Sequence, residues 1–158
     1  MDDERAIKAL TADLQWQIDQ LGPRGIKNTA GNPFVPTAFK RKLTEAIHAG
    51  DDAVAELVAT VVRKPPSQGF KRLEAAGSLD LAPELLVADG DRPYAHLFSD
   101  EDRELARARI GPHLETIAAR TAEHRSRVDA AREKLRTKGM PRRHELDAQL
   151  RRNRRVSR

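Results

Sequence analysis

Arginine is concentrated at the end of this chain. Between Arg142 and Arg158 the sequence contains seven arginines and only two acidic residues, Glu145 and Asp147. The position of this positive charge, rather than the choice of arginine over lysine, is the informative feature, because clustered cations can neutralise the phosphates of a nucleic acid. We therefore predict that this segment contacts the phosphates of a nucleic acid, DNA or RNA, with little preference among bases. The predicted contacts are Arg142, Arg143, Arg151, Arg152, Arg154, Arg155 and Arg158.

The positive charge is concentrated in one block near the end of the chain and is not spread evenly along it. Residues 1–20 sum to −3, residues 21–75 to +4, residues 76–119 to −5 and residues 120–158 to +9, for a net charge of +5. Such blocks are typical of segments that interact with polyanions. They are also typical of solvated, disordered tails, and composition alone leaves that alternative open.

A second cluster of cations falls at a predicted helix start. Pro65 and Pro66 break the chain, and Ser67 is a good N-cap for the helix that follows. Free backbone N–H groups beside cations favour an anion, so we predict a secondary phosphate contact here. An ordinary capped helix with solvated lysines explains the same pattern. The residues of this predicted contact are Lys64, Ser67, Lys71 and Arg72.

The sequence offers little for catalysis. It has no cysteine, which excludes disulfides, thiolate catalysis and Cys-ligated zinc. Its five histidines lie at no recognised metal spacing, and no serine lies in a nucleophile elbow. The acidic cluster Asp89–Asp102 is interpreted as solvated turns and helix starts. We therefore predict no catalytic residues, no metal and no cofactor, and a protein that is not an enzyme.

Composition also bears on partners and compartment. Aromatic residues make up 4% of the chain, too few for stacking on single-stranded bases. No apolar run approaches the roughly 18 residues of a membrane span, so no membrane partner is predicted. The first residues are acidic where a signal peptide would be basic. The predicted location is cytoplasmic.

Apolar spacing predicts helices throughout. In residues 3–21, Ile7, Leu10, Leu14, Ile18 and Leu21 share one face. Residues 37–48 and 52–64 form two helices joined by a short turn, with Thr37 and Asp51 as predicted caps, and the acidic start of the second argues against a DNA-reading helix-turn-helix. The residues predicted to face inward are Phe39, Leu43, Ala46 and Ile47 in the first helix and Val54, Leu57, Val58, Val61 and Val62 in the second. Further helices are expected at 67–76, 80–87, 100–110 and 112–138, and Ser99 is the predicted cap of the helix over 100–110. Residues 22–36 are predicted to form a loop that contacts a partner or is disordered.

These elements predict an all-α fold, an irregular helical bundle with a long C-terminal helix and a basic arm. The predicted domain is 1–138, and residues 139–158 are the arm, weakly docked or ordered on binding. Leu114, Thr121, Val128 and Leu135 recur every seven residues in the long helix. That spacing suits packing on its own chain or a thin coiled-coil seam.

The seam supports an alternative function. Helices 4–21 and 112–138 would pair between subunits, which makes the protein a homo-oligomer or a helical adaptor of a larger protein or ribonucleoprotein complex. The basic arm would then dock on an acidic partner.

Overall fold

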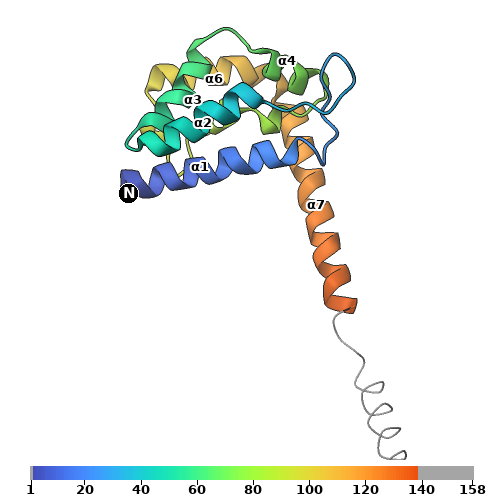
Figure 1. Cartoon of the computed structure of the whole chain (residues 1–158). Coiled ribbons are helices and arrows are strands. Elements are labelled where there is room, and N and C mark those ends of the chain that lie inside the picture. The colour runs from blue at the N-terminus through green and yellow to red at the C-terminus, as the bar shows by residue number, and fades with distance from the viewer. Residues whose placement is uncertain (1, 139–158) are drawn as a thin grey trace, which may run out of the picture. The chain divides into compact units, whose positions relative to one another are not determined.

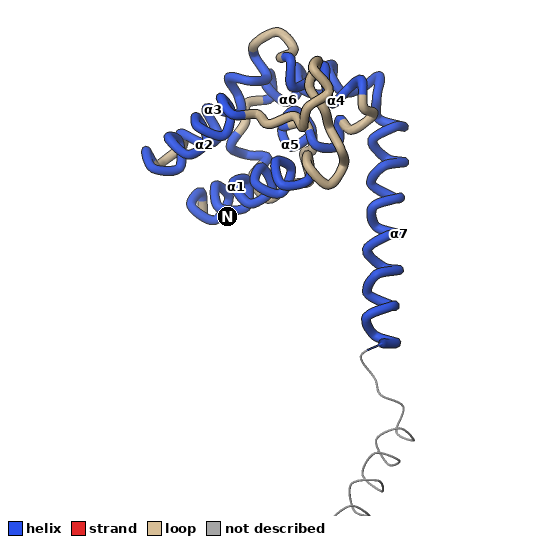
Figure 2. The backbone as a smooth tube through the Cα atoms, turned by 45° about the vertical axis from the view of Figure 1, so that its right-hand side comes forward, coloured by secondary structure: helices blue, strands red, loops and turns tan. Residues whose placement is uncertain are grey.

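The computed structural model describes residues 2–138, and within that range every regular element is a helix. The only extended pairing in these residues is an isolated bridge between Lys27 and Pro33. Figure 2 shows the helices joined by loops, with no strand in the described part. The predicted all-α class is confirmed. The elements are α1 (Asp3–Gln20), α2 (Thr37–Ala49), α3 (Ala53–Arg63), α4 (Gln68–Ala75), η1 (Leu79–Leu81), α5 (Pro83–Ala88), η2 (Ala95–Leu97), α6 (Asp100–Ile110), η3 (Gly111–His113) and α7 (Leu114–Lys138).

Helix α3 lies at the centre of the first compact unit of the chain, Met1–Arg120, which is called the body. It packs against α1, α2, α5 and α6 (Figure 1). Its sequence is valine- and alanine-rich with few polar residues, and a helix that is apolar on most sides is one that other helices surround. Its buried residues are Val54, Ala55, Val58, Ala59 and Val62.

Helix α1 places its apolar stripe against this centre. Leu10 and Leu14 are fully buried, and the helix contacts α3, α5 and η1 of its own chain. At its start the Asp2 side chain accepts a hydrogen bond from Glu4 N. Carboxylates in this position also suit the positive end of the helix dipole. The predicted helix over residues 3–21 is confirmed, and its apolar face is used within the chain.

The segment from Gly22 to Pro36 is ordered by its own hydrogen bonds. Ile26 is buried, and its carbonyl accepts from Phe34 N at 2.8 Å. The Asn28 side chain accepts from the backbone N–H groups of Ala30 and Asn32, which closes the tip. The disordered alternative for this loop is therefore wrong, because one buried side chain and a satisfied backbone hold it in place.

Two predicted caps are confirmed and two are wrong. Ser67 caps α4 by accepting from Phe70 N at 3.1 Å, and Ser99 caps α6 by accepting from Asp102 N. Thr37 instead lies inside α2, whose cap position is Pro36. The cap position of α3 is Asp52 rather than Asp51, and its side chain makes no capping bond. Both errors shift a helix start by one residue, within the usual uncertainty of such boundaries.

The acidic middle of the chain is only partly solvated. Asp102 is buried and forms a two-pronged ion pair with Arg63, with Nε to Oδ1 at 2.7 Å and Nη2 to Oδ2 at 2.8 Å. Hydrogen bonding from Arg63 lowers the pKa of Asp102. The interpretation of this residue as part of a solvated helix start is wrong. The pair joins the end of α3 to the start of α6.

Replacement of Asp102 by asparagine tests this pair. Because the folded-state pKa is lowered, the carboxylate stabilises the fold above its ordinary pKa, and that contribution is lost as the pH falls through the folded-state value. We expect Asp102→Asn to lower Tm by several degrees at pH 7, and the difference from the parent chain to shrink progressively as the pH falls below the ordinary pKa of aspartate. Thermal unfolding followed by circular dichroism over this range measures the difference. A constant difference in Tm at all pH values would contradict this role.

The chain divides into two units, Met1–Arg120 and Thr121–Arg158, and the division falls within α7. The long helix predicted over 112–138 is confirmed, except that Pro112 lies in the short turn η3 that precedes it. The predicted arm, residues 139–158, and the predicted boundary before it lie at and beyond the end of the described residues.

Candidate functional site

The part of α7 from Thr121 to Lys138 is exposed along its length, apart from His124 and Val128, which are half-buried. In the whole helix only Ile117 is buried. The exposed part carries three acidic residues, Glu123, Asp129 and Glu133, against six cations. The cations are Arg125, Arg127, Arg132, Lys134, Arg136 and Lys138.

The cations of α7 differ from the arginines of the body in how they are paired. Arg127 pairs with Glu123 and Arg136 with Glu133, both within the helix. The side chains of the other four cations form no ion pair with any described residue. In the body, the arginines that pair with carboxylates include Arg24, Arg41, Arg63, Arg92, Arg103 and Arg109.

The predicted arm contacts lie outside the described residues. These are Arg142, Arg143, Arg151, Arg152, Arg154, Arg155 and Arg158. They follow α7 directly in the sequence, so residues 121–158 form one basic stretch that begins on an exposed helix.

The predicted secondary anion contact is only partly brought together. Lys64 and Ser67 line a common pocket, whereas Lys71 and Arg72 are not among its lining residues. The Ser67 hydroxyl oxygen is occupied as the α4 cap. These four residues therefore do not converge on the pocket as a set.

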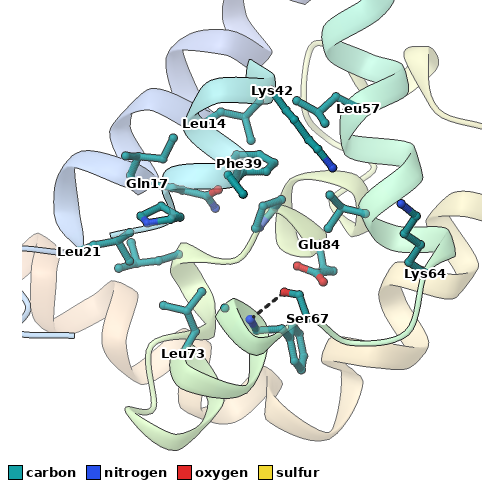
Figure 3. Close-up of a pocket in the computed structure, with 18 of the residues that line it drawn as sticks. Leu14, Gln17, Leu21, Phe39, Lys42, Leu57, Lys64, Ser67, Leu73 and Glu84 are labelled. Carbon is teal, nitrogen blue, oxygen red and sulfur yellow. Dashed lines mark hydrogen bonds between the residues drawn. The ribbon is translucent and has the colours of Figure 1, made fainter. Parts of the chain in front are cut away.

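This pocket lies in the body and has a volume of about 280 Å³. Helices α1, α2, α3 and α4 each contribute lining residues, as do the loop before α2 and the segment from η1 to α5. Figure 3 shows the mostly apolar wall, with the polar groups Gln17, Lys42, Lys64, Ser67 and Glu84 among the lining side chains. The remaining labelled residues are Leu14, Leu21, Phe39, Leu57 and Leu73.

Glu84 is an almost fully buried carboxylate in the wall of this pocket. It lies in the first turn of α5, and its Oε1 accepts from Arg109 Nη1 at 3.0 Å. Burial raises the pKa of Glu84, and the bond from Arg109 opposes that rise. Arg109 also donates to the carbonyls of Val62 and Lys64 and lies 5.9 Å from the centre of the Phe70 ring. Arg109 thus neutralises the charge of Glu84, and Arg109 is not itself one of the residues that line the pocket.

Gln17 leaves one polar atom unsatisfied. Its Nε2 donates to the carbonyls of Ala82 at 3.0 Å and Asp80 at 3.3 Å. Two carbonyl acceptors identify that atom as the nitrogen of the amide, since an oxygen there would face two oxygens. Gln17 Oε1 is buried and accepts no hydrogen bond from the described residues. Figure 3 shows the amide end of Gln17 directed into the pocket.

Comparison with known proteins adds no family to this picture. No family model, no curated protein and no solved structure matches the chain. Within residues 2–138, no helix is both long and apolar enough to cross a membrane. The candidate sites therefore stand on their own geometry.

Two residues of the pocket could have been noticed in the sequence, because each is a polar residue at a position where helical periodicity predicts an apolar one. Gln17 follows Leu10 and Leu14 on the apolar stripe of α1, where a polar residue is out of place. Glu84 interrupts the apolar run between Leu79 and Val87. A polar residue at a core position is buried at a cost unless it is paired, so it marks either a structural bond or a site.

Two apolar faces were predicted as wholly inward, and this is wrong in part. Leu57 and Val61 of α3 are half-buried and line the pocket instead of filling the core. In α2, Phe39 is also a half-buried lining residue, and Ile47 is 46% exposed. The α3 positions that replace them in the core are Ala55 and Ala59. Small residues there allow neighbouring helices to approach α3 closely.

Proposed function

We propose that the protein binds nucleic acid through the basic stretch 121–158, in which the exposed cations of α7 continue into the arginines of the arm. The observation that carries this proposal is that cations of α7 are not paired with carboxylates and can therefore bind phosphate groups. Four cations of α7 form no ion pair with any described residue, and they lie on one segment that leads into the seven arginines of the arm, whereas the unpaired cations of the body are spread over several elements. Unpaired cations on one segment are what a phosphate backbone requires.

Three carboxylates of the acidic middle of the chain support the same conclusion. Asp89 pairs with Arg92, Asp100 with Arg103, and Asp102 with Arg63. These carboxylates therefore have cationic partners inside the body. An arm that is not needed to neutralise them is available for an external polyanion.

Salt dependence tests the proposal. With six to eight phosphate contacts, we expect the affinity for a 20-base-pair DNA duplex or an RNA duplex to fall about 10³- to 10⁴-fold between 50 and 200 mM salt. Different base sequences of the same length are expected to bind within about threefold, because phosphate contacts carry no sequence information. Fluorescence anisotropy measures both quantities. A shallow salt dependence, or no binding at 50 mM salt, would contradict the proposal.

Assembly through α7 is a second candidate. Leu114 is 53% exposed and Leu135 is 72% exposed, and both belong to the seven-residue repeat. Large apolar side chains at such positions favour a partner helix. Sedimentation equilibrium separates the two candidates, because a monomer at all concentrations excludes pairing of α7 between copies.

A further inference from the structure

The pocket in the body has the composition of a small-molecule site. Its volume of about 280 Å³ is just below the usual range for sites of drug-sized ligands. Its wall is apolar and includes the aromatic rings of Phe34, Phe39 and Phe70. A few polar groups converge on it, and such groups fix the orientation of a ligand.

The charges at the pocket favour an anion. Lys42 and Lys64 line it, and neither forms an ion pair with another described residue. The carboxylate in the wall, Glu84, is already neutralised by Arg109. The lining therefore presents two ammonium groups without a counter-charge from the chain itself.

We propose that this pocket binds a small amphipathic organic anion, with its apolar body against the phenylalanine-lined wall and its anionic group at Lys42 and Lys64. This site is independent of the basic stretch 121–158, and its function does not require nucleic acid.

A pair of probes with one shape and opposite charge tests the proposal. We expect the full chain to bind 1-naphthoate saturably, and at least roughly tenfold more tightly than 1-naphthylmethylammonium, because two cations attract one probe and repel the other. Isothermal titration calorimetry measures both affinities. Amide chemical-shift changes in NMR spectra are expected at lining residues such as Phe39 and Gly69.

Matched variants show whether naphthoate binding depends on the lysines of the pocket or only on the net charge of the chain. Lys42→Glu/Lys64→Glu is expected to weaken naphthoate binding at least roughly tenfold. Lys27→Glu/Lys40→Glu makes the same change of charge at two exposed lysines outside the pocket and is expected to leave binding within about twofold. Leu57→Trp fills the pocket and is expected to abolish binding while circular dichroism shows an intact helical fold.

Four results would overturn the proposal. They are no saturable binding of naphthoate, equal or tighter binding of the ammonium probe, equal effects of the two lysine pairs, and unchanged binding by a folded Leu57→Trp chain. None of them bears on nucleic-acid affinity, so this site and the basic stretch succeed or fail separately.

Discussion

A chain that ends at Met140 is expected to bind a 20-base-pair duplex about 10³-fold more weakly than the full chain at 50 mM salt. The deletion removes all seven predicted arm contacts, and each neutralised phosphate releases counterions that favour binding. The six cations of α7 beyond Thr121 remain, so residual binding with a shallower salt dependence is expected. Fluorescence anisotropy over a salt series measures the affinity and its slope. Undiminished affinity would defeat the arm as the binding element.

A matched pair of variants shows whether position or total charge matters. Replacement of Arg151, Arg152, Arg154 and Arg155 by glutamine removes four arm charges. Replacement of Arg5, Lys8, Lys27 and Lys40 by glutamine removes four exposed charges from the body. We expect the arm variant to lose most of the affinity and the body variant to lose less than about tenfold, because screening limits distant charges. Equal losses would indicate that net charge alone drives association.

Replacement of Arg109 by leucine is expected to destabilise the fold by about 3–5 kcal/mol at neutral pH. The Arg109 and Glu84 side chains are 14% and 2% exposed, so the substitution leaves a buried carboxylate without its cation. It also removes donors to the carbonyls of Val62 and Lys64 at the end of α3. Urea unfolding measures the loss.

The loss should depend on pH in a defined direction. Burial already raises the pKa of Glu84, and removal of Arg109 takes away a group that opposes the rise. A carboxyl group with a raised folded-state pKa holds its proton at pH values where the unfolded chain has lost it, so stability falls as the pH rises through that window. We therefore expect a smaller deficit at pH 4.5 than at pH 7.5.

Two further variants isolate the buried charge. Glu84→Gln in the Arg109→Leu background removes the uncompensated carboxylate and is expected to recover part of the stability, with the pH dependence gone. Arg103→Leu, also on α6, breaks an ion pair with the 89%-exposed Asp100 and is expected to cost less than about 1 kcal/mol. A similar cost for both arginine substitutions would refute the importance of burial at Glu84.

The helical character of this protein is determined locally, and the sequence was sufficient to predict it. The spacing of Leu10 and Leu14, the Ser67 and Ser99 caps and the break at Gly50 act over one or two helical turns. Such signals do not depend on what the helix packs against. The all-α class and the order of the α-helices therefore followed from the sequence, with errors of one to three residues at helix starts. The largest error is at α5, which was expected from residue 80 but begins at Pro83, after the separate turn η1.

The concentration of charge in residues 120–158 is likewise a property of the sequence. Which carboxylate meets which cation in the body was decided by tertiary structure, since the Asp102–Arg63 and Glu84–Arg109 pairs join residues 39 and 25 positions apart. Long-range pairs have no periodic signature, so helical spacing cannot predict them.

The pocket could not have been predicted from the chain alone. Helical periodicity identifies Leu57 and Val61 as apolar positions, but it does not distinguish a residue that fills the core from one that faces a cavity. That distinction depends on whether helices from distant parts of the chain close completely on one another. Gln17 and Glu84 were visible in the sequence as polar residues in apolar surroundings. Only the fold brought them to one wall, because α1 and α5 pack together across more than sixty residues of intervening chain.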